Sequence, residues 1–333
     1  NMAMQPFKMM VGDMVNEKQK GLAYSIQSFL CNAGSLVGFL FPFIFTWIGI
    51  SNIAPQGVVP DSVIYSFYIG AAILILCVIY TTVKVKEMPP AEYAEYHGIT
   101  EEEKKEKINM VKLLVKAPKA FWTVGLVQFF CWFAFMFMWT YTNGSVAANV
   151  FDAPTVETVV NGASKIVLDT KSIQYQNAAD WVGVLFAVQA IGSVLWAVCI
   201  PMFKNRKLIY SLSLVLGGIG FISTYFVHNQ YVLFISFLLI GCAWAAMLAL
   251  PFTILTNALS GGHMGTYLGL FNGTICIPQI VAATLGGSIL ALFTPKGMLP
   301  PEINMLVMAG VMLIIGAVCV YLIKETKGEQ AKA

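Results

Sequence analysis

The chain of 333 residues is 58% hydrophobic and 11% charged, its mean hydropathy is +0.73, and its formal net charge is +3. Soluble domains contain about 45–50% apolar and about 25% charged residues, so this composition excludes a soluble globular protein. The apolar runs are continuous rather than alternating, which argues against membrane strands and predicts an all-α membrane protein.

Eight charge-poor segments follow one another, and each is long enough to cross the hydrocarbon core, which takes about 20 helical residues. They lie at 21–50, 62–83, 120–143, 180–203, 207–227, 231–259, 264–293 and 302–323, and a ninth, partial segment occupies 1–16. Segment 1–16 has no basic leader and contains Asp13, so we do not expect a signal peptide. We expect the end of a helix whose upstream neighbours are absent from this chain.

Two helix-turn-helix units of one pattern lie far apart in the chain. The first has Pro6 and Gly21 on either side of a short polar turn, and the second has Pro251 and Gly265 in the same places. Repeats of this kind are typical of membrane transporters built from two related halves.

The segment 84–119 is the one long charged stretch between apolar segments. Its last part, 108–116, reads as a short basic amphipathic helix suited to the cytoplasmic leaflet. We expect 84–119 to be a cytoplasmic linker between a partial N-terminal bundle at 1–83, with helices 4–6, and a C-terminal six-helix bundle at 120–323. A cytoplasmic tail at 324–333 follows.

The loop 143–180 is the other long connection, and we expect it on the outer side. Within it, the residues on either side of Asn161-Gly162 predict a β-hairpin at 156–169, because Asn-Gly favours the type I′ turn that matches strand twist. We interpret the hairpin as a cap or insertion without a role in transport.

Lysine and arginine are distributed unequally between the two sides. If the turn at 17–20 is cytoplasmic and the spans alternate, sixteen lie on the cytoplasmic side and three, Lys165, Lys171 and Lys296, on the outer side. This positive-inside bias predicts a multi-pass protein of the cytoplasmic (inner) membrane with a cytoplasmic C-terminus.

Lys8 and Asp13 are ionisable residues in or near the bilayer. Such groups are costly there, so they usually face a cavity, have a partner or move protons. Five helical residues place the two about 140° apart, so they need not pair directly. A carboxylate in a partly dry site can exchange a proton near neutral pH, which makes Asp13 a candidate for proton coupling. The alternative is that Asp13 only ends a helix beside the lysines of the 17–20 turn.

Amide side chains occur inside otherwise apolar spans, where each must hydrogen-bond to another helix or face water. A sugar needs such amides for its hydroxyls and an aromatic ring for its C–H faces. Gln128 and Trp132, one turn apart, fit that need, as do Asn272 and Gln279, seven residues apart on one face. Hydrogen bonds between helices are an equally good explanation of each amide. The amides are Gln27, Asn32, Gln128, Gln189, Asn272 and Gln279.

Small residues recur within the spans and allow helices to approach closely. Proline also lies within or at the ends of spans, where a bend or gate is plausible. The glycine groups are Gly34-x3-Gly38, Gly217-Gly218-x-Gly220, Gly265-x3-Gly269-x3-Gly273 and Gly286-Gly287, and the prolines are Pro42, Pro201, Pro251 and Pro278.

Enzymatic function has no support in the sequence. There is no nucleophile–base set, no metal-ligand cluster and no phosphate-binding Gly-Lys loop, so we expect no enzyme, no cofactor and no direct use of ATP. The three histidines, His97, His228 and His263, fall in loops, and all seven cysteines fall in spans, where small apolar packing is their expected role.

Several stretches together resemble the sucrose/proton symporter-like branch of the glycoside–pentoside–hexuronide transporters, within the major facilitator superfamily. Any one of them is a weak signal, and the combination is more specific. They are Gln5-Pro6-Phe7 with Lys8-Met-Met-Val-Gly-Asp13 in the fourth helix, Val127-Gln-Phe-Phe-Cys-Trp132-Phe-Ala134 in the seventh, Pro251-Phe252 in the tenth, and Leu268-Gly269-Leu-Phe-Asn272 with Pro278-Gln279 in the eleventh.

The resemblance implies the major facilitator fold, with two pseudo-symmetric six-helix bundles and the N-terminal one truncated here. It also implies proton-coupled import of a disaccharide or glycoside, such as maltose or sucrose, by alternating access. Asp13 would couple transport to protons, and Lys8 would replace the family's arginine, whose planar fork lysine lacks. The substrate-binding residues are then Gln5, Asn32, Gln128, Trp132, Asn272 and Gln279.

The partners are therefore a sugar, protons and the lipid bilayer, with no nucleic acid. The sugar, the coupling ion and the oligomeric state stay open. A facilitator for another small solute and a transport-inactive sugar sensor are the alternatives, although the short tail at 324–333 argues against a sensor.

Overall fold

The computed structural model of the chain describes residues 20–50, 61–86, 110–160, 163–259, 264–295 and 297–323, with a few single positions elsewhere. A helix lies at each of the eight predicted apolar segments. The long helices are α2 (Lys20–Trp47), α3 (Asp61–Lys84), α7 (Lys119–Asn149), α8 (Ile173–Cys199), α9 (Arg206–Ser223), α10 (Leu233–Ala258), α12 (Gly273–Phe293) and α13 (Ile303–Cys319). Shorter elements are α6 (Met110–Lys116), α11 (Met264–Phe271), η1 (Ile200–Met202) and η2 (Val320–Leu322).

Seven helical segments of the described part are long and apolar enough to cross a membrane. This confirms a multi-pass helical membrane protein. The segments are Asp61–Lys84, Lys119–Asn149, Ile173–Met202, Arg206–Ser223, Leu233–Ala258, Gly265–Phe293 and Ile303–Leu322.

Two helices are longer than the apolar segments that predicted them. α7 continues to Asn149 rather than 143, and α8 begins at Ile173 rather than 180. A helix ends where its backbone groups are capped and not where its side chains become polar. Ser172 provides such a cap, since its Oγ accepts the N–H of Tyr175 at 3.3 Å.

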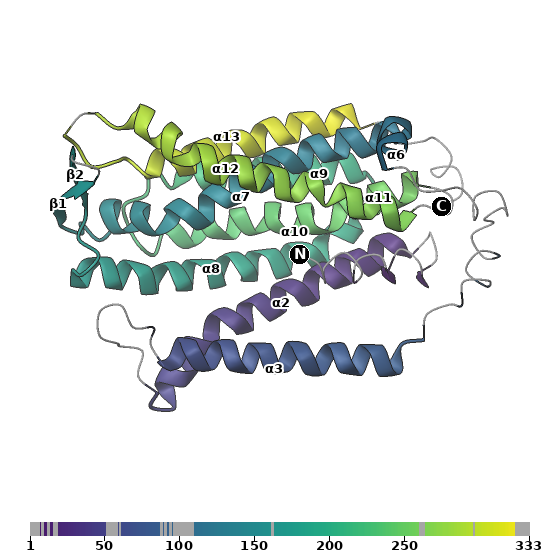
Figure 1. The fold of residues 1–333 in the computed structure, drawn as a ribbon, viewed down its shortest axis with the longest axis horizontal. Helices are drawn as coiled ribbons and strands as arrows, with labels where there is room; N and C mark the ends of the chain where they lie inside the picture. Colours follow the sequence, from purple (N-terminus) through teal and green to yellow (C-terminus); the bar gives the residue numbers. More distant parts are fainter. Residues whose placement is uncertain are drawn as a thin grey trace.

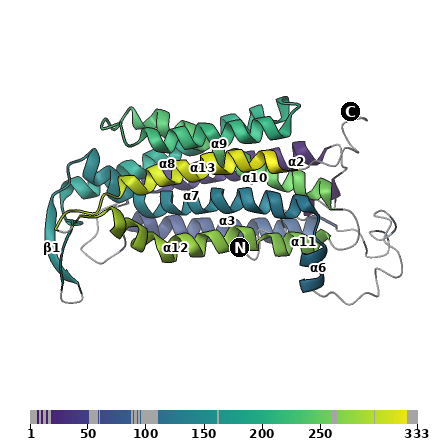
Figure 2. The same ribbon diagram turned by 90° about the horizontal axis from the view of Figure 1, so that it is seen from above.

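α7 and α10 are the most buried of these spans, and the other helices of residues 119–323 surround them (Figures 1 and 2). α10 packs on α8, α9, α7 and α2, and α13 packs on α7 and α9. α2 lies along α8 and α10, whereas α3 packs chiefly on α2 and leaves almost all of its apolar side chains exposed. Apolar side chains at the surface suit a helix that faces lipid.

Glycines allow the helices of the larger bundle to approach closely. A Cβ at Gly192 of α8 would lie 2.5 Å from Leu238 O of α10, and one at Gly310 of α13 would lie 2.7 Å from Gly218 O of α9. The prediction of close packing therefore holds for Gly217, Gly218 and Gly220, and for Gly286. No described atom lies within 4 Å of a Cβ at the predicted positions Gly34, Gly38, Gly269 and Gly287.

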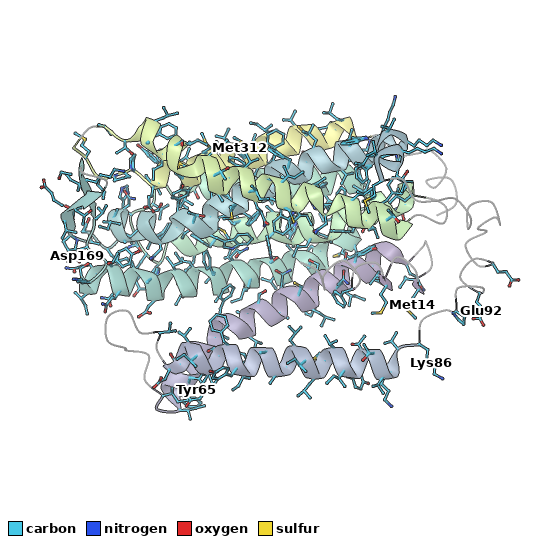
Figure 3. All side chains as sticks on the ribbon, in the orientation of Figure 1. Met14, Tyr65, Lys86, Glu92, Asp169 and Met312 are labelled. Carbon is cyan, nitrogen blue, oxygen red and sulfur yellow. The ribbon has the colours of Figure 1, made fainter. Side chains whose placement is uncertain are left out.

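The predicted hairpin is present. β1 (Thr155–Val160) pairs antiparallel with β2 (Ala163–Leu168), and Val160 opposite Ala163 leaves a two-residue connection. The Asn161-Gly162 turn itself lies outside the described residues. The hairpin and the connection from α12 to α13 share one end of the molecule, near the labelled Asp169 in Figure 3, and α6 and α11 share the other (Figures 1 and 3).

Candidate functional site

The two repeated units meet between α2 and α10. A Cβ at Gly21 would lie 3.6 Å from Thr253 Cγ2, and the rings of Tyr24 and Phe252 have centroids 6.2 Å apart. In the second unit, α10 ends at Ala258 and α11 begins at Met264, as the pattern predicts. Most of the first unit before α2, including Gln5, Lys8 and Asp13, lies outside the described residues.

Asn32 of α2, two turns along the helix from Tyr24, is fully buried. Its Nδ2 donates to Ser28 O at 2.7 Å, one turn back in the same helix, and its Oδ1 has no partner in the described part of the chain. Ser28 Oγ in turn donates to Ala245 O of α10 at 3.4 Å. An amide oxygen buried without a partner costs free energy, so it marks a place where a hydrogen-bond donor is expected.

Gln128 of α7 is also fully buried, and one end of its amide has a structural role. Pro251 has no N–H, so the carbonyl of Met247, four residues earlier in α10, loses its helical donor. Gln128 Nε2 supplies that donor at 3.1 Å from Met247 O. The other end, Oε1, is buried without a partner among the described atoms. The amide therefore bonds to another helix and also keeps a free acceptor.

Trp132, one turn along α7 from Gln128, belongs to an aromatic cluster. Its ring centroid is 5.7 Å from that of Trp244 in α10 and 6.4 Å from that of Trp139. The ring centroid of Phe135 lies 4.8 Å from that of Trp244, which makes Phe135 the fourth member of the cluster. Trp132 Nε1 is buried with no described partner. Trp139 is partly exposed, and its ring also packs within this cluster.

The middle of α10 connects these residues. Within a single turn, Trp244 contacts the Trp132 ring, Ala245 O accepts from Ser28, and Met247 O accepts from Gln128. Trp244 was not predicted as a site residue. Its place as a large aromatic between small residues, in Cys242-Ala243-Trp244-Ala245-Ala246, is the signal that would have indicated it.

Asn272 and Gln279 belong to the segment of α11 and α12 rather than to α2, α7 or α10. Asn272 separates α11 from α12, and its N–H bonds to Leu268 O and Gly269 O, both at 3.2 Å. The backbone of Asn272 keeps helical angles, φ −58° and ψ −24°, and Gly265–Phe293 is one segment long and apolar enough to cross the membrane, in agreement with the predicted span 264–293. Gln279 is half-buried on α12. The described contacts with α7 include Thr274 and Gly286 of α12, against Gly125 and Tyr141, and Phe271 of α11, against Phe121. These contacts connect neither amide to the cluster on α10.

The remaining predicted amide with a recorded partner, Gln27, donates from Nε2 to Phe7 O at 3.3 Å. For Gln27, a hydrogen bond within the protein is a sufficient explanation. Asn32, Gln128 and Trp132 are thus the predicted residues that combine deep burial with an unpartnered polar atom.

The described helices form a multi-pass bundle, with buried polar atoms on α2 and α7 beside α10. The family model described as Major Facilitator Superfamily matches residues 2–167 and 146–333. The chain therefore belongs to the major facilitator superfamily, and its all-α membrane fold is that of the family. A search of curated proteins found no match.

Proposed function

We propose that this transporter is a secondary active sugar importer coupled to protons. Seven buried polar atoms of the described residues have no hydrogen-bond partner. The observation that carries the proposal is that three of them belong to predicted site residues beside the middle of α10: Asn32 Oδ1, Gln128 Oε1 and Trp132 Nε1. Two are acceptors and one is a donor, and they come from the two helices that contact the middle of α10.

A sugar fits this combination better than an ion or an apolar solute does. Its hydroxyls both donate and accept, and its C–H faces pack on aromatic rings, here those of Trp132 and Trp244. A simple inorganic ion would need charged or carbonyl ligands, and an apolar solute would leave the buried polar atoms without partners. Asn272, Gln279 and Gln5 remain proposed contacts of the same substrate.

Proton coupling rests on Asp13, with Lys8 as the second charged residue of the same segment. In the proposed mechanism, Asp13 gains a proton on the outer side and loses it on the cytoplasmic side, while the bundles at 1–83 and 120–323 alternate in access. The linker 84–119 and the C-terminus are cytoplasmic in this proposal, and the membrane is the cytoplasmic one. The charge distribution between the loops supports that orientation.

The test is uptake of labelled maltose and sucrose by the full-length protein in vesicles, with and without an inward proton gradient. Accumulation that requires the gradient and is lost in Asp13→Asn supports the proposal. Equilibration without accumulation would indicate a facilitator, and binding without flux would indicate a sensor. Gln27→Leu is the matched control, because Gln27 has a recorded partner and is expected to leave sugar affinity unchanged.

A further inference from the structure

Glu302 has no role in the proposed transport site. It lies directly before α13 and outside the span Ile303–Leu322, at the end of the molecule that carries the hairpin (Figure 1). Its carboxylate rests on the backbone of α7, because a Cβ at Gly144 would overlap Glu302 Oε2. At this end of the molecule, the contact between α7 and the start of α13 therefore consists of the Glu302 carboxyl group against Gly144.

The groups that face this carboxyl provide little compensation for a negative charge. Tyr141, three residues before Gly144 on α7, interacts with it electrostatically, and the Tyr141 hydroxyl lies against Gly286 of α12. In the described part of the chain, no lysine, arginine or histidine contributes to its environment. Lys296, on the preceding connection, lies outside the described residues. The first turn of α13 favours a negative charge to a small extent.

Burial has a larger effect on the pKa of Glu302 than these neighbouring groups have. It raises the pKa of Glu302 to about 7, because surroundings of low polarity disfavour the ionised form. A neutral carboxyl can remain against Gly144, whereas an ionised one gains free energy by moving into water.

We propose that Glu302 is a proton-binding site through which the pH on the hairpin side controls the packing of α13 on α7. Protonated Glu302 fits against Gly144 without burying a charge. Ionised Glu302 leaves that position and loosens the contact at this end. The site belongs to a different segment from Asp13, so it acts independently of the proposed coupling carboxylate.

The direction of the pH effect follows from the two protonation equilibria. The packed carboxyl has a pKa of about 7, and one released into water has the ordinary value of 4.5. The packed form therefore binds more protons between these values. It is fully favoured below pH 4.5 and loses its advantage progressively as the pH rises to 7. With pKa values of about 7 and 4.5, the equilibrium between the packed and released carboxyl changes by at most about 300-fold over that window.

The experiment is labelling with a hydrophobic carbodiimide, which reacts with protonated carboxyl groups in apolar surroundings. Labelling of Glu302 in the reconstituted full-length protein is measured by peptide mass spectrometry from pH 4 to pH 9. Glu157, exposed on β1, serves as the reference for the reagent's own pH dependence. The expected midpoint for Glu302 is near pH 7. A midpoint near 4.5, or no labelling at any pH, would overturn the proposal.

Two variants test whether burial or a nearby lysine sets the midpoint of Glu302 labelling. Gly144→Ala places a methyl group where the carboxyl lies, so it should move the midpoint toward 4.5. Lys296→Met should leave the midpoint near 7, and a rise of a unit or more would show that a lysine, rather than burial alone, sets it.

A second measurement does not depend on access of the reagent. The unfolding temperature of the wild type should fall between pH 5 and pH 8 relative to that of Glu302→Gln, which stays neutral throughout. Glu157→Gln should show the same pH dependence of the unfolding temperature as the wild type. Equal pH dependence in the wild type and in Glu302→Gln would contradict the proposal.

Discussion

A proline and an amide on different helices determine one hydrogen bond at the centre of the molecule. Pro251 removes the donor for Met247 O, and Gln128 replaces it from α7. In a membrane no water is at hand to satisfy such a carbonyl, so the partner must come from the protein. One end of the Gln128 amide therefore holds α7 against the bend of α10, and only the other end is available to a substrate.

Replacing Gln128 should consequently have an effect that depends on Pro251. Gln128→Ala removes the donor and should destabilise the protein by about 1 kcal/mol, in keeping with polar contacts between membrane helices. In Pro251→Ala the N–H of residue 251 bonds to Met247 O, so the added Gln128→Ala change should cost much less. Unfolding temperatures of the four proteins in detergent form the double-mutant cycle. Equal costs of Gln128→Ala in both backgrounds would contradict this role.

The indole N–H of Trp132 should contribute to substrate binding separately from its ring. Trp132→Phe keeps an aromatic ring beside Trp244 but removes the donor. The expected result is an increase of about tenfold in the KM for sugar, the effect of one lost hydrogen bond of about 1.4 kcal/mol. Trp122→Phe, on the same helix with its ring mostly exposed, is the control and should leave KM unchanged. An unchanged KM in Trp132→Phe would remove Trp132 Nε1 from the site.

At the scale of elements, close packing depends on particular glycines and not on glycine content. Gly241 of α10 lies against Gln189 and Ser193 of α8, whereas Gly183 of α8 has no described atom within 4 Å of a Cβ. Gly241→Ala should destabilise the protein by about 1–3 kcal/mol through overpacking. Gly183→Ala should be neutral, or stabilising by up to about 1 kcal/mol, because alanine favours the helix. Thermal unfolding in detergent measures both, and similar unfolding temperatures for the two variants would contradict the packing argument.

The helices were predictable because about 20 apolar residues are a strong and local signal. The hairpin was predictable because Asn161-Gly162 specifies a turn. The helix ends at Asn149 and Ile173 were not predictable, because polar residues beyond the hydrocarbon core can continue a helix without changing the apolar pattern.

The site could be predicted only in part. Burial of Asn32, Gln128 and Trp132 follows from polar side chains in apolar spans, but their common neighbour, the turn of α10 at Trp244 to Met247, depends on how distant helices pack. The sequence shows that Pro251 leaves a carbonyl without a donor. It does not show that Gln128, 119 residues away from Met247, supplies the donor. Glu302 was missed because it lies at the end of a span, where a charged residue is ordinary.

At the scale of the whole molecule, the contact between the repeated units is expected to open and close. Gly21 of α2 lies against Thr253 of α10, at the end of the molecule that carries α11. Transport in this superfamily requires access to alternate between the two sides, so the contact present here must separate during the cycle if the bundles move relative to one another.

A disulfide across this contact tests that motion. A Cβ at Gly21 would lie 3.6 Å from Thr253 Cγ2 and more than 4 Å from Thr253 Cβ. The double variant Gly21→Cys/Thr253→Cys therefore falls at the upper end of the range for bridged Cβ atoms, about 3.5–4.5 Å. Oxidation should abolish net uptake, and reduction should restore it. Each single variant controls for the seven native cysteines, which carry free thiols. Because a bridge at this contact prevents only its opening, substrate should still bind from the hairpin side. Full uptake by the oxidised, cross-linked protein would show that α2 and α10 stay together throughout the cycle, and alternation would then have to occur between other helices.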